Sequence, residues 1–577
     1  MSLLPFSNLP PYRARNLIPA ETDLGEWSQL APLFDCLEAR AGEARTVRQF
    51  EQWILDWGEL SAAVEEEGAK RHIAMTCHTD NPDAEKAYLH FVEEIEPRLK
   101  PRQFDLAKRY LGHPLCSQLP RHRYEVFHRE TALRVELFRE ANIALETQDA
   151  RLGNDYNKLS GSLTVSHRGE EKTLVAMGRY QEETDRTVRE EAWRLVAECR
   201  LKEQDHFEDL FDQLVKLRHQ IALNAGFANY RDYAFRSKGR FDYTPKDCEQ
   251  FHQSIETEVM PVVRQLQIER ARRLKIDRLR PWDLAVDSLN RPPLRPFSDV
   301  AQMETMTQTL FNRLDADLGG QFGILRHLRL LDLANRKGKA PGGYQSTLAE
   351  ARMPFIFMNA VGVQRDIETI LHEAGHAFHA LATRDEDLFA YRSAPIEFCE
   401  VASMAMELLA DGFLDVFYSA PDCARARQVH LEGILGVFPW IAAVDAFQHW
   451  VYTHPDHNRA ERAGAWNQIL DRFGGDTDWS GCESARTHLW HKQLHIFLYP
   501  FYYVEYGIAQ MGALQVWANF RKDPSKALAD YKAGLALGGS RPLPELFLRA
   551  GCRFDFSRET LRPLVENVRA EIGMIPC

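Results

Sequence analysis

The sequence predicts a mainly α-helical protein of more than one lobe, with a small amount of β-structure. The chain has 577 residues, more than one simple hydrophobic core usually accommodates, so we expect a division into lobes. Several long segments repeat apolar residues every three to four positions, which is the period of an amphipathic helix. Strand signals are few and short, at 163–175 and 353–359.

Composition and charge narrow the class of protein. Hydrophobic residues make up 45% and charged residues 27% of the chain, and the net charge is −12. A chain this acidic is a poor partner for a nucleic-acid backbone. We see no secretory signal and no apolar run long enough for a transmembrane helix. The ten cysteines are scattered without a C-x-x-C pair, as in a reducing compartment. We therefore expect a cytoplasmic protein with no nucleic-acid and no membrane partner.

The N-terminal part reads as a helical scaffold. Between positions 46 and 157, Phe50, Trp53, Trp57 and Leu60 illustrate the helical spacing, and no chemical constellation stands out. Next, 163–165 and 173–175 flank a turn at Gly169, which predicts a β-hairpin. We take this hairpin as the junction between an N-terminal helical region, 1–165, and a second region, 166–577.

Further helices and one functional strand follow. Helices are predicted over 186–223, 245–274 and 301–318, the last ending at the Gly319-Gly320 pair. The glycine-rich segment 338–343 is predicted to be a loop. The apolar run 353–359 reads as a strand, and Pro354 suggests that it lies at a sheet edge. Such an edge could pair with an extended peptide. The candidate substrate-binding residues are Phe357, Asn359, Ala360, Gly342 and Gly343.

The chemistry centres on an H-E-x-x-H motif. His372 and His376 are four residues apart, so on a helix their imidazoles lie on one face and can reach one Zn²⁺ at about 2.0–2.1 Å. Glu373 can reach a water on the metal without being a ligand, which suits a general base. The alternative is a helix without a metal site, which carries a partly buried histidine pair.

A third ligand has to come from elsewhere. His379 lies seven residues after His372, a rise of about 10.5 Å, too far for one ion. A carboxylate on the following helix is the remaining option. Glu397, Glu400 and Glu407 are spaced by three and seven residues there and lie near one face. A buried carboxylate stripe of this kind needs a cation or a partner.

At this point the chain resembles the zinc oligopeptidases of the thimet oligopeptidase and oligoendopeptidase F family. In that family a glutamate within E-x-x-S completes the zinc site, and Glu400-Val-Ala-Ser403 stands at the matching distance from His372. The resemblance therefore implies Glu400 as the third ligand. It also implies that Glu368, one turn before His372, orients a ligand imidazole.

The resemblance extends to a downstream aromatic segment. His495, Tyr503 and Tyr506 match a histidine and two tyrosines, three apart, that contact the scissile carbonyl in the family. The spacing from His495 to the tyrosines favours the oligoendopeptidase F branch. So do 227–232, 239–244 and 537–546, and the likeness covers roughly 180–556.

The resemblance implies a fold and an activity. The expected fold is a two-lobed helical ellipsoid with a deep central channel and a small β-sheet beside the zinc helix. The expected activity is hydrolysis of internal bonds of short peptides with one Zn²⁺ and Glu373 as the base. A metallocarboxypeptidase or dipeptidyl peptidase of similar architecture is the alternative, followed by a non-catalytic zinc-containing peptide-binding protein. The sequence does not determine the oligomeric state.

Overall fold

The protein consists of two compact units, each assembled from three segments of the chain. The computed structural model describes residues 4–6, 9–336, 338–340 and 342–574. Unit 1 comprises Met1–Phe138, Arg295–Cys423 and Gly512–Phe554, and unit 2 comprises Arg139–Leu294, Ala424–Met511 and Asp555–Cys577. The predicted mainly helical fold with a small sheet is confirmed. The division at 165/166 stays a prediction.

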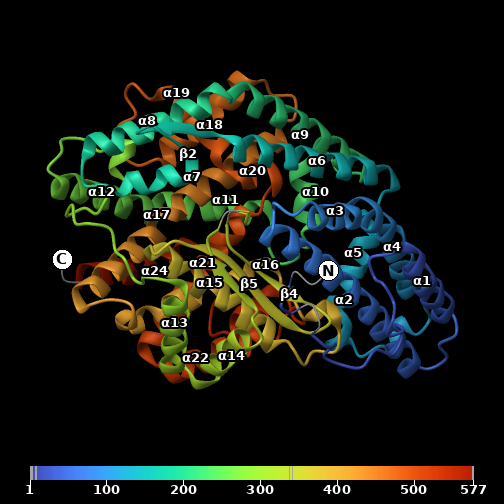
Figure 1. The fold of residues 1–577 in the computed structure, drawn as a ribbon. Helices are drawn as coiled ribbons and strands as arrows, with labels where there is room; N and C mark the ends of the chain where they lie inside the picture. Colours follow the sequence, from blue (N-terminus) through green and yellow to red (C-terminus); the bar gives the residue numbers. More distant parts are fainter. Residues whose placement is uncertain (1–3, 7–8, 337, 341, 575–577) are drawn as a thin grey trace. The chain divides into compact units, whose positions relative to one another are not determined.

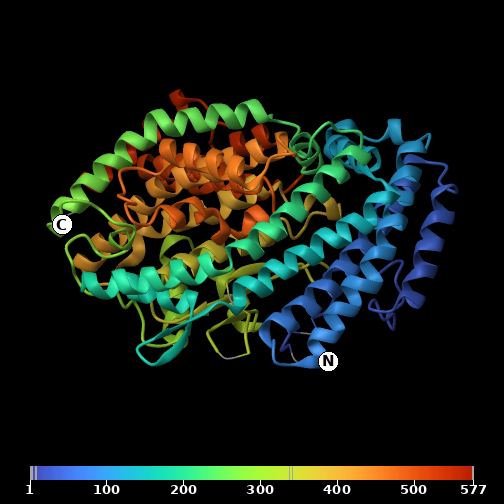
Figure 2. The same ribbon diagram turned by 90° about the horizontal axis from the view of Figure 1, so that it is seen from above.

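Unit 1 contains the small sheet and most of the N-terminal helices (Figure 1). The helices α1, α2 and α4 lie side by side in both views (Figures 1 and 2). Its elements are α1 (Trp27–Ala41), α2 (Val47–Cys77), α3 (Pro82–His90), α4 (Glu96–Gly112), α5 (Arg121–Leu137), α13 (Val300–Leu314), α14 (Ala316–His327), β3 (Leu331–Ala334), β4 (Tyr344–Leu348), β5 (Met353–Ala360), α15 (Gln364–Ala382), α16 (Ile396–Ala410), α22 (Pro524–Leu535) and α23 (Leu543–Arg549).

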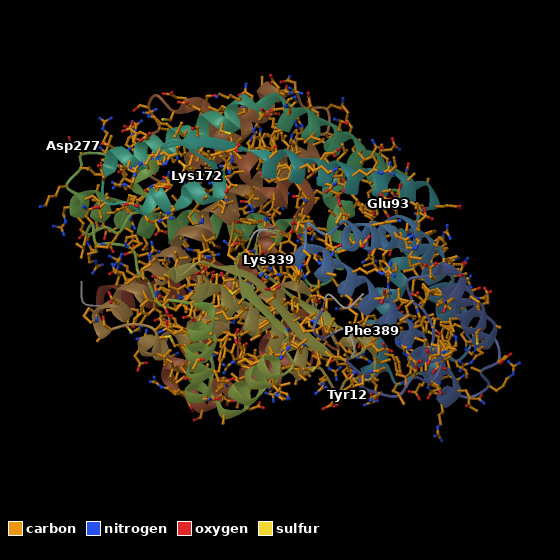
Figure 3. The ribbon with its side chains drawn as sticks, viewed as in Figure 1. Tyr12, Glu93, Lys172, Asp277, Lys339 and Phe389 are labelled. Atoms are coloured by element: carbon orange, nitrogen blue, oxygen red, sulfur yellow. The ribbon has the colours of Figure 1, made fainter. Side chains whose placement is uncertain are left out.

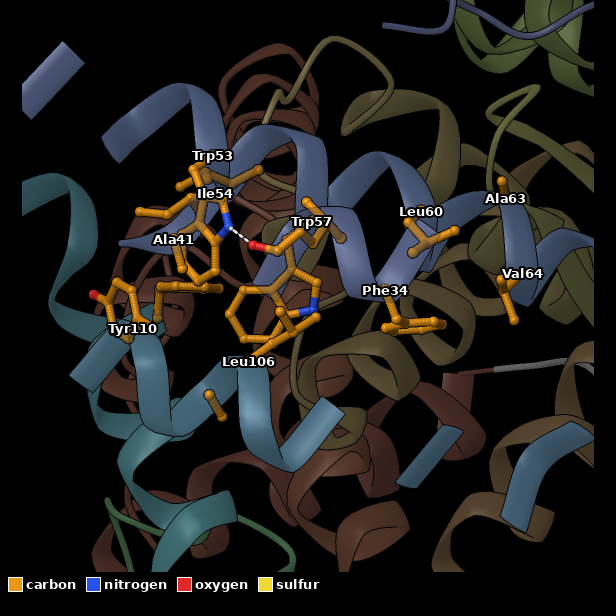
Figure 4. Close-up of a cluster of buried hydrophobic side chains, with 14 of the residues drawn as sticks. Phe34, Ala41, Trp53, Ile54, Trp57, Leu60, Ala63, Val64, Leu106 and Tyr110 are labelled. Atoms are coloured by element: carbon orange, nitrogen blue, oxygen red, sulfur yellow. Dashed lines mark hydrogen bonds between the residues drawn. The ribbon is translucent and has the colours of Figure 1, made fainter. Parts of the chain in front are cut away.

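The predicted apolar stripe of α2 forms the core of the N-terminal helices (Figure 4). Trp53 is 1% exposed and its Nε1 donates to the carbonyl of Leu37 at 2.8 Å, so its polar atom is satisfied inside the core. Thr46 caps the helix by accepting from the backbone N–H of Gln49 at 3.3 Å. The cap at Thr46 and the helical spacing of the apolar residues therefore both agree with the observed position of α2 in the core.

The three-stranded sheet of unit 1 has the order β3-β5-β4. Strand β5 pairs in parallel with β3 and antiparallel with β4, so it is the central strand. The prediction that 353–359 forms a sheet edge is therefore wrong. Pro354 lies opposite Thr347 at the end of the ladder, where a missing N–H does not prevent pairing further along the strand. The two edges of the sheet belong to β3 and β4.

Unit 2 is helical apart from the predicted hairpin. The hairpin pairs Val165 with Lys172, and its turn residues Arg168 and Gly169 have φ of 55° and 80°, as a type I′ turn requires. The elements are α6 (Glu140–Ser162), β1 (Thr164–His167), β2 (Glu170–Thr173), α7 (Leu174–Met177), α8 (Arg186–Lys202), α9 (Gln204–Asn224), α10 (Tyr230–Ser237), α11 (Pro245–Ser254), α12 (Met260–Leu274), α18 (Arg459–Phe473), α19 (Glu483–Thr487), α20 (Leu494–Leu498) and α24 (Arg558–Met574).

Several predicted boundaries differ from the observed ones. The second hairpin strand ends at Thr173, whose hydroxyl accepts from the N–H of Ala176 and starts α7. The predicted helix over 186–223 is interrupted at Glu203. The helix over 245–274 contains a π-helical turn, Ile255–Val259, directly before Pro261, which has no N–H to continue the ladder.

Contrary to our prediction, the glycine pair at 319–320 does not end a helix. The break falls at Asp315, whose carboxylate accepts from the N–H groups of Asp317 and Leu318 and so caps α14. Gly319 lies inside α14. A Cβ at this position would meet Asn312 Cα of α13 at 2.9 Å, so a larger residue does not fit there. The glycine permits a close helix–helix contact.

Two helices, α17 (Ala420–Thr453) and α21 (Tyr503–Lys522), contain the unit boundaries at 423/424 and 511/512. Although we expected no transmembrane segment, α17 has the length and the mean hydropathy, 1.3 over 18 residues, to cross a membrane. However, 56% of that window is buried inside the protein, as in a core helix. The nine cysteines among the described residues are free thiols, as predicted; Cys577 lies outside these residues.

Candidate metal centre and its surroundings

The helix that carries the H-E-x-x-H motif is anchored directly after the central strand. Helix α15 begins four residues after the end of β5. The carboxylate of Asp366, in the first turn, accepts hydrogen bonds from the N–H groups of Val361, Gly362 and Val363 at 2.8–3.0 Å. These bonds satisfy free donors at the helix N-terminus and favour a negative charge there. The strand therefore determines where the helix starts.

Helices α15 and α16 approach each other closely at the glycine of the motif. A Cβ on Gly375 would lie 2.6 Å from Ala402 O and 2.6 Å from Ser403 Cα. No side chain fits in that space, so the two backbones are in contact. Ser403 and Glu400 belong to the same turn of α16, and the Ser403 hydroxyl donates to Glu400 Oε2 at 3.1 Å. The close contact therefore brings Glu400 next to the motif.

Three candidate ligands come together at this contact. Glu400 Oε2 lies 3.4 Å from His372 Nε2 and 3.6 Å from His376 Nε2, and the three ligand atoms lie within 4.8 Å of one another. Bonds of about 2.0–2.1 Å in tetrahedral geometry separate neighbouring ligand atoms by roughly 3.3–3.4 Å. The two distances to Glu400 are thus close to those that one metal ion requires.

The residue that holds His372 from behind is Glu407. Its Oε1 lies 2.7 Å from His372 Nδ1. Glu368 accepts instead from Gln364 at 3.0 Å and lies 3.4 Å from Arg365, so the prediction that Glu368 orients His372 is wrong. Side chains on a helix tilt toward its N-terminus, which turns Glu368 away from His372. The spacing of Glu407, seven residues after Glu400 on one face of α16, was the available sequence signal.

Charge in the site is unevenly distributed. Although burial opposes protonation, the carboxylates of Glu400 and Glu407 hold the pKa of His372 well above its usual value. Burial lowers the pKa of His376 to about 4. The pair therefore consists of one imidazole that two carboxylates favour as a cation and one that stays neutral. A divalent cation would replace the proton on His372 and compensate the same carboxylates.

Glu373 is placed beside the ligands but in a different environment. It is 7% exposed, and burial raises the pKa of its carboxyl group to about 7. The backbone N–H of Gln345 in β4 donates to this carboxylate and works against the rise. A carboxyl group with a pKa near neutrality is matched to proton transfer at physiological pH.

Two other nearby side chains are not part of the ligand group. His379 is 4% exposed, its ring packs edge-on against Phe398, and burial lowers its pKa to about 3. This agrees with the exclusion of His379 as the third ligand. The thiol of Cys399 donates to the carbonyl of Ala394 at 3.4 Å, and burial raises its pKa to about 12. A protonated thiol is a poor metal ligand.

A pocket of about 790 Å³ opens beside His376 in unit 1. It is lined by Gln345, Ser346 and Thr347 of the edge strand β4, by the later part of α15, and by residues of α2. Phe389, labelled in Figure 3, lies on its wall. The edge strand and one candidate ligand, His376, therefore line one cavity, which is large enough for several residues of a peptide.

The predicted substrate-binding residues lie around the central strand. Phe357 is fully buried and Ala360 is 7% exposed, and both pair within the sheet. Asn359 donates to the carbonyls of Ala340 and Gly342 at 2.8 and 3.0 Å. Gly343 packs against Thr369 of α15, where a Cβ would lie at 3.2 Å. The argument from a free β5 edge no longer supports these residues, although their substrate role stays a prediction.

The described part of the 338–343 loop is held in place by Lys339, which is labelled in Figure 3. Its buried Nζ donates to the carbonyl of Met358 at 2.5 Å and pairs with Asp332 at 2.9 Å. The backbone N–H of Ala340 donates to the carbonyl of Thr76 at 2.8 Å. Position 341 lies outside the described residues.

The predicted carbonyl-contacting residues form an aromatic group in unit 2. The ring of His495 lies 5.0 Å from that of Tyr503 and 5.8 Å from that of Tyr506, both edge-on. The two tyrosine rings are 5.5 Å apart. His495 Nδ1 is 2.7 Å from Gln493 Nε2. The three residues are thus neighbours, as their spacing suggested, and their part in catalysis stays a prediction.

The start of the tyrosine helix contains a strained residue. Phe501, two residues before α21, has φ of 61°, a left-handed conformation that is rare for a bulky side chain. Its N–H donates to the Gln448 side chain at 3.0 Å, and its carbonyl accepts from the guanidinium of Arg240, which also pairs with Glu505 at 2.8 Å. These buried bonds maintain the strained turn that orients the first residues of α21.

Gly375→Ala tests the backbone contact between α15 and α16. The added methyl would meet backbone atoms at 2.6 Å, so the helices must separate, at a cost of about 1–3 kcal/mol. We expect a lower melting temperature. Gly320→Ala in α14 is the control, because no atom lies within 4 Å of its Cβ position and alanine favours a helix. Equal melting temperatures for Gly375→Ala and the wild type would contradict the close contact.

Known proteins share this fold over most of the chain, with sequence identities of 26–27%. The structure superimposes on PZ peptidase A with an inhibitor at a TM-score of 0.90 and 26% identity, over 97% of this chain and 99% of that one. It matches a proposed oligoendopeptidase F at a TM-score of 0.91 and 27% identity, again over 97% and 99% of the two chains.

Sequence comparison also finds a similarity to an oligopeptidase, over a shorter part of the chain. The chain is 25% identical to oligopeptidase PepF of Bacillus subtilis (strain 168) over 228 residues, a match that spans 39% of this chain and 33% of the relative. The description of the peptidase M3 N-terminal domain fits residues 23–138. That of peptidase family M3 fits residues 179–566, more than half of the chain. The chain therefore belongs to peptidase family M3, a family of metallopeptidases.

Proposed function

We propose that this protein is a zinc-dependent oligoendopeptidase that hydrolyses internal bonds of short peptides. The observation that carries the proposal is the convergence of His372, His376 and Glu400, with Glu373 next to His372 in the chain and a cavity of unit 1 open beside His376. Membership in peptidase family M3 supports peptides as the substrates. The alternative is an exopeptidase of similar architecture, which removes residues from a peptide end.

The residues present suit a single zinc ion. Two imidazoles and a carboxylate form a ligand set that catalytic zinc sites commonly use, with a position left for water. Glu407, behind His372, would fix the imidazole tautomer and increase its basicity. When bound, Zn²⁺ supplies a Lewis acid that lowers the pKa of water and polarises a carbonyl group.

Glu373 moves the proton in the proposed reaction. As a carboxylate it accepts a proton from the attacking water, and as a carboxylic acid it delivers that proton to the leaving amide nitrogen. The Gln345 N–H holds the carboxylate so that it faces the ligands without entering the ligand group. The positive charge of a bound metal would favour the ionised form and lower the pKa from its value of about 7.

The His495 group supplies the proposed donors to the developing oxyanion. Tyr503 and Tyr506 have hydroxyl groups suited to this role, and His495 orients them through its ring contacts. These three residues belong to unit 2 and the candidate ligands to unit 1. The central channel that the family resemblance implies would admit short peptides and exclude folded proteins.

Strand β4 is our proposed support for the substrate backbone. It is the edge strand next to β5, and its residues 345–347 line the pocket beside His376. An extended peptide that pairs with β4 would continue the sheet by strand addition. The same strand donates to Glu373 from Gln345, so the peptide and the general base would share one rigid element. This replaces β5 as the peptide-binding edge.

Glu373→Gln separates chemistry from metal binding. Glutamine keeps the size of the side chain but cannot accept the proton, so we expect kcat to fall by at least the roughly 10²–10⁴-fold that general-base catalysis contributes. The bound zinc, measured by elemental analysis of the same sample, should remain at the wild-type level. Glu400→Ala is the complementary variant and should lose zinc together with activity. Full activity of Glu373→Gln on a quenched-fluorescent peptide would refute the assigned base.

Glu407→Gln tests the support behind His372. The variant loses the charged partner of Nδ1, and such losses typically weaken metal affinity about 10–100-fold. The measurement is a zinc titration against a competing chelator. Glu368→Gln, one helical turn before His372 on α15, is the matched control, and we expect its zinc affinity to be unchanged. A lower zinc affinity in Glu368→Gln than in Glu407→Gln would indicate Glu368 as the orienting residue instead.

Product mapping distinguishes an oligoendopeptidase from its alternative. We expect mass spectrometry of a ladder of peptides to show cleavage at internal bonds, with activity falling as the peptides grow into folded proteins. Blocking both peptide ends, by acetylation and amidation, should leave cleavage intact. Stepwise loss of single residues or dipeptides from an unblocked end, absent in the blocked peptide, would favour the exopeptidase.

A further inference from the structure

A second group of metal-ligating side chains lies in unit 2, in the interface between helices α11 and α17. Cys248 and His252 are four residues apart on α11, and Asp445 and His449 are four residues apart on α17. Each pair therefore lies on one face of its helix. All four side chains are buried, with exposures of 0%, 4%, 0% and 7%.

The ligand atoms of this group are nearly at metal-binding distances. Asp445 Oδ2 lies 2.8 Å from His252 Nε2 and 3.3 Å from His449 Nε2. One ligand atom each from Cys248, Asp445 and His449 lie within 4.8 Å of one another. Tetrahedral zinc sites separate their ligand atoms by roughly 3.3–3.6 Å, the longer value applying to sulfur. His252 contacts this group through Asp445, and its ring lies 5.7 Å from that of His449.

Part of this polar group is left unsatisfied by the protein. Neither ring nitrogen of His449 and only one carboxylate oxygen of Asp445 has a hydrogen-bond partner within the described part of the chain. The His449 ring is held between Phe235 and Phe501, edge-on at 5.6 and 5.4 Å. Buried polar atoms normally have partners. His449 Nδ1 has no partner within the described residues, and Nε2 has only Asp445 Oδ2 at 3.3 Å, so this imidazole can bind a ligand that the chain itself does not supply.

The charge balance also calls for a cation. Asp445 is fully buried, and its Oδ1 has no hydrogen-bond partner within the described residues. Within the same part of the chain, no lysine or arginine forms an ion pair with Asp445. A buried carboxylate beside two imidazoles and without such a partner is costly unless a cation joins it.

We propose that Cys248, His252, Asp445 and His449 form a second, structural metal site that binds a transition-metal ion of the Zn²⁺ class. A thiolate, two imidazoles and a carboxylate are a ligand set that zinc accepts and that magnesium and calcium do not favour. Four protein ligands make a closed, four-coordinate site, which is typical of structural zinc. The ion would cross-link α11 to α17 in the interior of unit 2.

The site differs from the candidate catalytic centre in two measurable respects. It contains a thiolate, whereas the group of His372, His376 and Glu400 contains none. It is also enclosed, so its metal would exchange slowly and would be acquired during folding. Cobalt reports the first difference, because Co²⁺ bound to a cysteine thiolate shows a near-ultraviolet charge-transfer band that nitrogen and oxygen ligands do not produce.

The test uses full-length protein produced with either zinc or cobalt as the supplied metal. We expect elemental analysis to find two metal equivalents per chain in the wild type and one in Cys248→Ser. The cobalt form should show the thiolate charge-transfer band in the wild type and not in Cys248→Ser. The double variant His372→Ala/His376→Ala should lose activity yet keep one equivalent and the band. This outcome separates the second site from the proposed function.

Controls keep the result interpretable. Cys552→Ser replaces another buried thiol, which donates to the carbonyl of Gly512, and should leave both the stoichiometry and the band unchanged. His449→Ala should lose one equivalent and lower the melting temperature of the metal-loaded protein. The proposal is overturned if the wild type binds one equivalent under zinc excess and its cobalt form lacks the band. It is equally overturned if Cys248→Ser retains both.

Discussion

The candidate metal centre of unit 1 depends on one close contact between two helix backbones. At Gly375, α15 touches α16 near Ala402 and Ser403, with no room for a Cβ atom. The contact places Glu400 Oε2 within 3.6 Å of two imidazole nitrogens on the neighbouring helix. Had the helices packed at the usual 8–10 Å between axes with larger side chains, a glutamate would have had to extend further to reach both histidines. The glycine of the motif is therefore a structural requirement of the site.

Around that contact the protein concentrates carboxylates in a buried place. Glu373, Glu400 and Glu407 lie near His372. Burial raises the pKa of Glu373, whereas Glu400 and Glu407 raise the pKa of His372 against the effect of burial. Such an arrangement is unfavourable without a positive charge. The electrostatics of the site therefore agree with the metal ion that we propose for this member of a metallopeptidase family. The same reasoning, applied to Asp445 and its two histidines, underlies the second site that we propose.

The sheet contributes rigidity rather than a large core. Strand β5 is paired on both sides, and α15 starts from its end through the Asp366 hydrogen bonds. Lys339 attaches the loop before β4 to β3 and β5. Strand β4 is left with an outer edge beside the pocket and with an N–H directed at Glu373. In the function that we propose, this small framework would position the peptide, the general base and the metal ligands.

Some of this was determined by the sequence alone, because it depends on local geometry. The helical period placed most helices correctly, and the four-residue spacing of His372 and His376 put both imidazoles on one face. Helix ends were less predictable: Gly319 looked like a terminator, but it serves a close contact with Asn312 instead. The hairpin at Gly169 was predicted because its turn chemistry is local.

Only the tertiary structure decided which partners meet across elements. The orientation of α16 selected Glu407 instead of Glu368 as the partner of His372 Nδ1, since a side chain on the same helix points away while one on a neighbouring helix can point in. Sheet order made β4 the edge strand and β5 the centre, which a proline in the sequence could not reveal. The buried group at α11 and α17 joins residues almost two hundred positions apart. The sequence determined the faces of the helices, and long-range packing determined what those faces contact.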